Sequence, residues 1–408
     1  MEFLSVVYLV YMFIAIYFLL FYILVYLHNR KNLFDYARTD KKYTISVLVP
    51  VFNEEKTIEN TINAIFEVDY SIEELIVLND GSTDNTRKIV EKLKKKYPKL
   101  KLINKKNSGK ADSLNKGIEL AKGELVVVVD ADSYPAKDSF GRLVGYFDDE
   151  KTGAATCVFV PRNKNKFLEK LQDTEYRVIA FTRKLLGYVG AIWVTPGPLA
   201  MYRKDVLKKI GGFDKNNLTE DIEITWNLAK HGYERRMCLS THATTSVPVN
   251  LKAWYKQRRR WNIGGLQCIS KYKGEFFEKG MLGMFILPFF TIQLFLGLIG
   301  LSIFVYLIFR RALADLLFAT YSIQIGTPIL TRNSLFITPS FLNYLGVIIF
   351  ITGFIFTLVV LGIVKTESLL KKQNLFNLIF YLIIYLAVYP VILVSAVYNF
   401  MTKNYKWR

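Results

Sequence analysis

The sequence predicts a doubly wound, Rossmann-like α/β domain joined to a bundle of α-helices that cross a membrane. Four apolar segments, at 3–27, 281–309, 341–364 and 375–400, carry no charged residue, and each exceeds the roughly 18 residues that indicate a transmembrane helix. The intervening residues 28–280 are polar overall and alternate strand-like with helix-like patterns. The first apolar segment has no basic stretch before it and no small-residue cleavage site after it. We therefore expect a retained helix rather than a cleaved signal peptide.

Three apolar runs in the polar part read as strands, at 43–52, 74–80 and 123–132. They are rich in valine, isoleucine and leucine without strict alternation, which is typical of strands covered on both faces of a parallel sheet. Helical stretches separate these runs, and the expected ranges are 55–67, 83–97 and 109–122. In a doubly wound sheet, ligands bind outside the carboxyl ends of the strands. We therefore expect functional residues at the carboxyl ends of the three strands.

Carboxylates follow each of these strands. Glu54 comes after the first, Asp80 ends the second, and Asp130 and Asp132 end the third. Side chains at i and i+2 of a strand point to the same side, and two carboxylates held together favour a hard divalent cation. The pattern predicts a magnesium or manganese site at Asp130 and Asp132. For Asp80, a turn or a helix N-cap is an equally open interpretation.

The stretch LTEDIEITWNLAKHG, at 218–232, has two interpretations. Thr219 is suited to a helix N-cap, acids in the first turn favour the helix dipole, and Gly232 is suited to a position just past the helix end. The same spacing would hold Asp221 as a general base at the start of a helix. The sequence leaves both roles open.

The stretch KQRRRWN, at 256–262, also has two interpretations. If 254–266 is helical, Gln257, Arg260 and Trp261 lie on one face, with the arginine able to hold a diphosphate and the tryptophan able to pack against a sugar ring. Arg258 and Arg259 are then expected to point to lipid headgroups. The alternative treats all three arginines as a basic collar at the membrane surface.

The formal net charge is +19, which suits anionic lipid or phosphorylated substrates. We expect no nucleic-acid partner, because no nucleic-acid motif accompanies this charge. The three cysteines have neither disulfide-scaffold nor metal-ligand spacing. The basic stretch at 28–31 follows the first apolar segment and predicts a multi-pass protein of the cell membrane whose polar domain is cytoplasmic.

Six motifs in order carry a resemblance to a known family: PVFNEE, NDGSTD, GKADSLN, DAD, TED and QRRRW. They resemble the membrane-embedded family 2 glycosyltransferases, which include cellulose, chitin and hyaluronan synthases and bacterial poly-β-1,6-N-acetylglucosamine synthases. The chain looks most similar to the last group. Asn79 and Phe52 are departures, at positions where an acid and a tyrosine are common.

The resemblance implies a GT-A-type catalytic domain in which Pro50 and Glu54 line a nucleoside pocket. It implies that Asp80 hydrogen-bonds the uracil, that Lys110 approaches the nucleotide, and that Asp130 contacts the UDP-sugar.

For the reacting end, the resemblance implies that Asp132 ligates Mg²⁺ or Mn²⁺ and that Asp221 is the catalytic base. Glu220 of the same TED motif is expected among the substrate-binding residues. Three residues of the last motif are expected to close over the diphosphate and the acceptor end: Gln257, Arg260 and Trp261.

The expected function is inverting, metal-dependent transfer from a UDP-sugar, with UDP-N-acetylglucosamine as the expected donor. The product would be a β-linked polysaccharide made at the bilayer and exported through the chain's own helices. The alternative is transfer of one sugar to a lipid acceptor, a polyprenyl phosphate or a glycolipid. A catalytically silent assembly partner is disfavoured by the retained carboxylates, and an accessory membrane subunit is left open. The expected units are an N-terminal membrane helix, the catalytic domain, interface helices and a C-terminal region of about three membrane helices, at 1–30, 31–250, 251–280 and 281–408.

Overall fold

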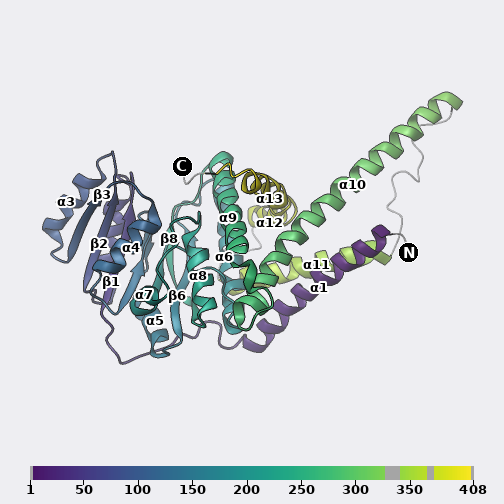
Figure 1. Ribbon diagram of the computed structural model, residues 1–408. Helices are drawn as coiled ribbons and strands as arrows, with labels where there is room; N and C mark the ends of the chain where they lie inside the picture. The colour runs from purple at the N-terminus through teal and green to yellow at the C-terminus, as the bar shows by residue number, and fades with distance from the viewer. Residues whose placement is uncertain (1–2, 327–340, 365–371, 406–408) are drawn as a thin grey trace.

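The computed structural model describes residues 3–326, 341–364 and 372–405 and contains an α/β domain beside a group of long helices (Figure 1). The domain is built on one eight-stranded sheet in the order β3-β2-β1-β4-β7-β6-β8-β5. The strands are β1 (Ile45–Val51), β2 (Glu74–Asp80), β3 (Leu100–Lys105), β4 (Leu125–Val128), β5 (Ser133–Pro135), β6 (Thr152–Pro161), β7 (Ala200–Arg203) and β8 (Glu234–Thr245). The predicted Rossmann-like α/β class is confirmed.

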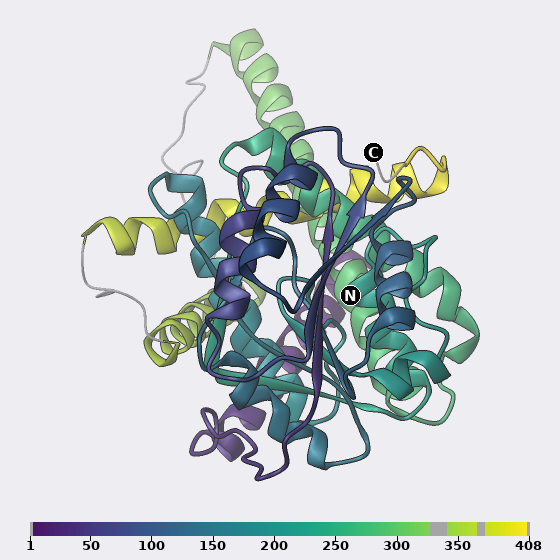
Figure 2. The same cartoon turned by 90° about the vertical axis from the view of Figure 1, so that its left-hand side faces the viewer.

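The first half of the sheet is parallel, as the apolar runs predicted. β1 pairs with β2 and with β4, and β2 pairs with β3, all in parallel. Every residue of β1 and β2 is buried, because helices cover both faces. One face packs against α2 (Ile58–Phe66), α3 (Thr86–Lys96) and α5 (Ser139–Val144). The other packs against α4 (Lys110–Leu120), α7 (Lys204–Lys209) and α8 (Glu220–Lys230), as Figure 2 allows the reader to follow.

The second half of the sheet is mixed, which the sequence did not predict. β7 runs antiparallel to both β4 and β6, whereas β8 runs parallel to β6 and antiparallel to β5. Two long helices, α6 (Phe167–Tyr188) and α9 (Leu251–Tyr272), stand between this half and the apolar helices (Figure 1). The KQRRRWN stretch lies within α9, so the expected helix is present.

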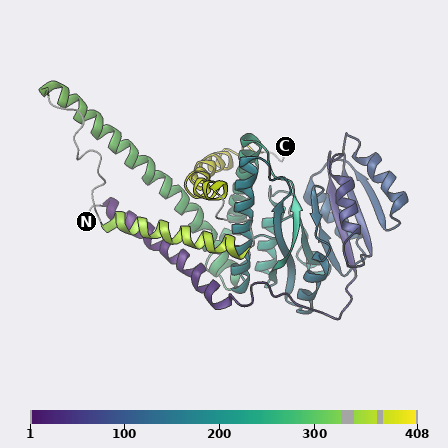
Figure 3. The ribbon, with the colours of Figure 1, turned by 180° about the vertical axis from the view of Figure 1, so that it is seen from behind.

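Four helices are long and apolar enough to cross a membrane: Ser5–Asn29, Leu282–Ile325, Tyr344–Ile363 and Leu375–Met401. These spans overlap the helices α1 (Phe3–Asn29), α10 (Leu287–Ile325), α11 (Phe341–Ile363), α12 (Lys372–Phe380) and α13 (Leu386–Met401). Figures 1 and 3 show α1 and α11 side by side and α10 as the longest helix. The expected helical membrane region is therefore matched in the parts of the chain that the structure describes.

Residues 310–340 have a mixed composition, which is compatible with an external loop carrying an interfacial helix or with a re-entrant element. Instead, α10 continues through Arg310 and Arg311 to Ile325, and Gly326 ends it in the left-handed conformation (φ +66°) that glycine adopts without strain. The remainder of that range, 327–340, lies outside the described residues.

Two adjacent glycines allow α9 to pass between the TED segment and α10. A Cβ atom added to Gly264 would lie 2.0 Å from the Thr219 hydroxyl oxygen, and one added to Gly265 would lie 2.8 Å from the Phe290 ring. Both distances are shorter than van der Waals contact. The pair thus fixes how closely α9 approaches Thr219, which directly precedes Glu220 and Asp221.

We predict that Gly264→Ala lowers the free energy of unfolding by about 1–3 kcal/mol, because the added methyl group must displace Thr219 or the whole helix. Thermal unfolding of the full chain in detergent measures the change. Gly274→Ala is the matched control, because an added Cβ there meets open space among the described residues. Equal melting of the two variants would contradict the prediction.

Candidate active site

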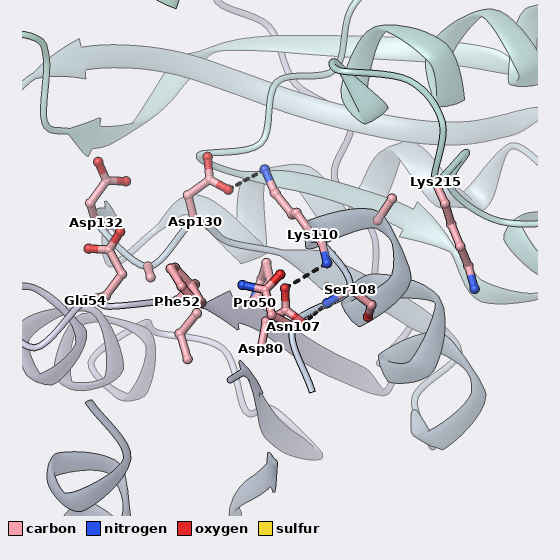
Figure 4. Close-up of a pocket in the computed structure, with 14 residues that line it drawn as sticks. Pro50, Phe52, Glu54, Asp80, Asn107, Ser108, Lys110, Asp130, Asp132 and Lys215 are labelled. Atoms are coloured by element: carbon pink, nitrogen blue, oxygen red, sulfur yellow. Dashed lines mark hydrogen bonds and ion pairs between the residues drawn. The ribbon is translucent and has the colours of Figure 1, made fainter. Parts of the chain in front are cut away.

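A cleft of about 420 Å³ opens at the carboxyl ends of β1, β2 and β4 (Figure 4). Its volume falls in the range of pockets that bind small molecules. Of the predicted site residues, it is lined by Pro50, Glu54, Asp80, Lys110, Asp130 and Asp132. The sheet therefore brings the expected nucleotide and metal residues together, at the edge that the strand pattern indicated.

The cleft is also lined by residues for which the sequence did not predict a role in binding: Phe52, Asn107, Ser108, Gly109 and Lys215. Three of them lie in the loop before α4. Their signal in the sequence was the polar, glycine-containing stretch NSG that precedes the motif's lysine.

Asp80 holds this loop in place. Its carboxylate accepts hydrogen bonds from the backbone N–H groups of Ser108 and Gly109, both at 2.9 Å, and from the Lys105 ammonium at 2.6 Å. Gly109 has φ +95°, a conformation that favours glycine. Asp80 is thus a loop-fixing residue at the floor of the cleft. A carboxylate has about four acceptor positions, so one remains for a ligand.

Lys110 joins the cleft to the TED segment. Its ammonium lies 2.7 Å from a carboxylate oxygen of Asp130 and 2.7 Å from one of Glu220. Burial alone would lower the pKa of Lys110, but the nearby carboxylates, first that of Asp130 and then that of Glu220, raise it above its ordinary value. The pKa of Glu220 stays below its ordinary value despite burial, because Lys110 and Arg260 favour its charged form.

A loop that the sequence analysis missed covers this ion pair. A Cβ atom added to Gly197 would lie 2.6 Å from the Lys110 ammonium and 2.8 Å from Asp130 Oδ2. The backbone at Gly197 can approach the pair only because glycine has no side chain there. The Pro-Gly-Pro sequence at 196–198 was the available signal.

Asp132 sits in an excess of negative charge. Burial, followed by the charges of Asp130 and Glu54, raises its pKa to about 6. Figure 4 shows Glu54 and Asp132 near one another, away from Lys110. Carboxylates crowded in this way suit a divalent cation, which would relieve the repulsion between them.

The described residues do not, however, include any group of three His, Cys, Asp or Glu side chains arranged to hold a metal ion alone. A cation here would complete its coordination with oxygen atoms of a bound diphosphate and with water, as Mg²⁺ commonly does. The donor set therefore fits a metal that binds together with a nucleotide.

Asp221 lies in the first turn of α8, directly after Glu220, which pairs with Lys110. Burial and the neighbouring Glu220 charge raise its pKa to about 6, against the opposing charges of Lys110 and Arg260. It is therefore mostly ionised at neutral pH and more basic than an ordinary aspartate, which suits a general base. Thr219 occupies the N-cap position, but its hydroxyl donates to Asn217 Oδ1 at 3.1 Å.

The α9 motif meets the same region from the other side. Arg260 donates a hydrogen bond from Nη1 to the Leu218 carbonyl at 2.9 Å, two residues before Glu220. Its charge reaches both Glu220 and Asp221. Gln257 and Trp261 lie on either side of Arg260 along α9, and both contact Arg258. None of the five predicted residues Glu220, Asp221, Gln257, Arg260 and Trp261 is among those lining the cleft of Figure 4.

The expectation that Arg258 points to lipid headgroups is wrong. Its side chain is fully buried and forms an ion pair with Glu175 of α6. The spacing of the motif indicates that Arg258 leaves the face of Gln257, Arg260 and Trp261, but it carries no information about the packing of α6 against α9. Arg259 lies over the ring of Tyr255, with its Cζ 5.4 Å from the ring centre, and its contact with lipid stays a prediction.

Comparison with known proteins agrees with the six-motif resemblance. Residues 46–211 match the profile of glycosyl transferase family 2. The chain is 32% identical over 247 residues to a poly-beta-1,6-N-acetyl-D-glucosamine synthase of Staphylococcus epidermidis, covering 60% of each protein. It is 31% identical over 234 residues to the protein of that name from Staphylococcus aureus strain COL, covering 57% of each. The chain thus spans about 60% of the length of these relatives.

Among solved structures, the mannosyltransferase PcManGT from Pyrobaculum calidifontis, in complex with GDP-Man and Mn²⁺, superposes with a TM-score of 0.66. The match covers 98% of this chain and 100% of that one, at 20% sequence identity. At this identity the similarity shows the fold.

We predict that Lys110→Met lowers the free energy of unfolding by about 1–3 kcal/mol, because it leaves Asp130 and Glu220 without their shared cation. Chemical denaturation of the full chain in detergent measures the effect. Lys116→Met is the matched control on the same helix, since its pair with Glu119 is largely exposed and is expected to contribute little. A loss no greater than that of the control would show that the bridge does not hold the site together.

Proposed function

We propose that this chain, whose residues 46–211 form a glycosyl transferase family 2 domain, transfers a sugar from a nucleoside diphosphate sugar to a growing β-linked polysaccharide. UDP-N-acetylglucosamine is the donor we expect, in keeping with the names of the relatives. The observation that carries the proposal is the Lys110 bridge between Asp130 and Glu220, which sets a nucleotide-sized cleft beside the basic carboxylate of Asp221.

At the donor end, Pro50 and Glu54 would line the nucleoside pocket, with Asp80 presenting its remaining acceptor position to the base. Asp130 would contact the UDP-sugar, and Asp132 would hold Mg²⁺ or Mn²⁺. The ion supplies positive charge to the diphosphate leaving group. The Lys110 ammonium, already in the cleft, would add to the same stabilisation once a diphosphate draws it from its carboxylates.

At the acceptor end, Asp221 would take the proton from the attacking hydroxyl group. A bond forms between the acceptor oxygen and the anomeric carbon while the bond from that carbon to the diphosphate oxygen breaks. One attack from the opposite face converts an α-linked donor into a β-linked product. Gln257, Arg260 and Trp261 on α9 would bind the diphosphate and the acceptor sugar, with Glu220 orienting Lys110.

The four apolar helices support placing the chain in the cell membrane. The basic stretch at 28–31, directly after the first of them, supports a cytoplasmic catalytic domain, at 31–250. The helix α9 would lie at the boundary within the expected interface region 251–280. We propose that the polymer leaves through the membrane helices, either of this chain alone or of this chain together with an accessory subunit.

The test uses full-length protein in nanodiscs with Mn²⁺ or Mg²⁺ and a panel of nucleotide sugars, recording nucleotide release and product size together. We expect release with UDP-N-acetylglucosamine, a product of high molecular weight, and loss of both on adding EDTA. A product of one sugar on lipid would replace polymer synthesis with glycolipid synthesis at the same site. If none of the nucleotide sugars in the panel gave nucleotide release, the proposal would be contradicted.

We predict that Asp221→Asn lowers the transfer rate by about 10²–10⁴-fold, because the amide cannot accept the proton, while UDP affinity is retained. In the unaltered chain, the rate should fall as pH drops below about 6, where Asp221 becomes protonated. Steady-state rates and UDP titrations across pH measure both. Asp205→Asn, an exposed aspartate in the first turn of α7, is the matched control. Near-native turnover by Asp221→Asn would reject the base assignment.

A further inference from the structure

The guanidinium of Arg258 is a buried charge that the proposed mechanism does not use. It is fully buried, and it donates from Nε at 3.2 Å and from Nη2 to the two carboxylate oxygens of Glu175. Glu175 is also buried, so this is a two-pronged ion pair inside the protein. Such a pair requires further hydrogen bonds to offset the cost of removing both charges from water.

Those further hydrogen bonds come from a helix that is long and apolar enough to cross a membrane. Tyr385 donates its hydroxyl to Glu175 Oε2 at 2.7 Å, and Tyr389 donates to Oε1. Tyr389 also accepts from Arg258 Nε at 2.9 Å. The Tyr385 hydroxyl accepts from the Trp254 indole of α9 at 2.6 Å. Both tyrosines lie on one side of the helix, because they are four residues apart.

The helix is irregular at this point. Residues Tyr381–Tyr385 form a π-helical turn, and Pro390 lies inside α13 directly after Tyr389. π-helical turns occur frequently at functional sites. Here the irregular segment is the part of the helix that supplies the two hydroxyl groups to Glu175.

On its other side, Arg258 holds two residues of the proposed acceptor end. Its Nη1 donates to the side-chain oxygen of Gln257. Its guanidinium stacks over the indole of Trp261, with Cζ 4.1 Å from the ring centre, a separation at which a cation and an aromatic ring attract. Arg258 therefore restrains Gln257 and Trp261, which together with Arg260 are the α9 residues that the proposed function places at the substrate.

We propose that Arg258 is a positioning residue, which orients Gln257 and Trp261 for the acceptor, and that Glu175 and Tyr389 make this orientation depend on helix α13. The inference rests on the proposed function, since it assigns a purpose to contacts with those two residues. It gives the membrane helix a direct physical connection to the site. A shift of Tyr389 would move the Glu175 carboxylate. That movement would displace the Arg258 guanidinium, which contacts both Gln257 and Trp261.

The test compares three variants of the full chain in nanodiscs. Arg258→Lys keeps the charge but loses the planar fork and the stacking. Glu175→Gln removes the partner charge. Tyr389→Phe removes one hydroxyl group and leaves the ion pair intact, so it reports on the coupling even if the first two variants fold poorly.

We expect each variant to lower kcat for transfer by about 10- to 100-fold and to shorten the product, because small displacements of positioning groups have effects of this size. The donor KM and the UDP affinity should not change. Arg259→Lys, the next residue of α9, and Tyr398→Phe, an exposed tyrosine of α13, are the matched controls.

Three outcomes would overturn the inference. The first is that kcat and product length match those of the controls. The second is that UDP affinity falls in proportion to kcat, which would indicate a general structural role. If the unaltered chain shows no transfer, the proposed function fails, and hydrogen exchange of the α9 backbone at 254–262 tests the positioning role instead. The third outcome is then that exchange in Arg258→Lys is unchanged relative to Arg259→Lys, which would reject the positioning role.

Discussion

The site depends on the ion pairs that the Lys110 ammonium forms with Asp130 and Glu220. The parallel sheet and the start of α8 bring several carboxylates close together, and without a cation among them their mutual repulsion would oppose the fold. By contacting Asp130 and Glu220 at 2.7 Å each, Lys110 connects the end of β4 to the first turn of α8. Gly197 completes the arrangement, because its missing side chain lets a loop cover the pair. The cleft and the TED segment thus form one electrostatic unit.

A second ion pair has the corresponding role beside the long apolar helices. Arg258 and Glu175 are both buried, and their charges are satisfied by hydroxyl groups of the α13 region. Burial lowers the pKa of Arg258, but Glu175 together with the neighbouring Tyr176 and Tyr385 raises it above its ordinary value. The helices α6 and α9 are therefore tied to one another and to a candidate membrane helix by polar contacts, in addition to the apolar packing of Leu171, Trp254 and Ile392.

The sequence predicted the parallel half of the fold and the four long apolar helices because their signals are local. A run of buried β-branched residues, or a long stretch without charge, has few structural solutions. The carboxyl ends of parallel strands meet at one edge, so the grouping of Glu54, Asp80, Asp130 and Asp132 followed as well. The mixed half of the sheet was not predictable in this way, since the pairing of β6, β7 and β8 depends on contacts between distant segments. Arg258 illustrates the same limit, because its partner is 83 residues away in the chain.

The pKa values of Asp132 and Asp221 are both raised to about 6, and the difference between their causes fits the two roles proposed for them. For Asp132, after burial, the shift comes from Asp130 and Glu54, which are carboxylates that a bound cation would neutralise. For Asp221, after burial, it comes from Glu220 and is opposed by Lys110 and Arg260, which are fixed protein charges. Metal binding would therefore lower the pKa of Asp132 toward its ordinary value, while Asp221 would keep most of its basicity. Environments that separate two similar groups in this way are how one fold assigns one carboxylate to a metal and another to a proton.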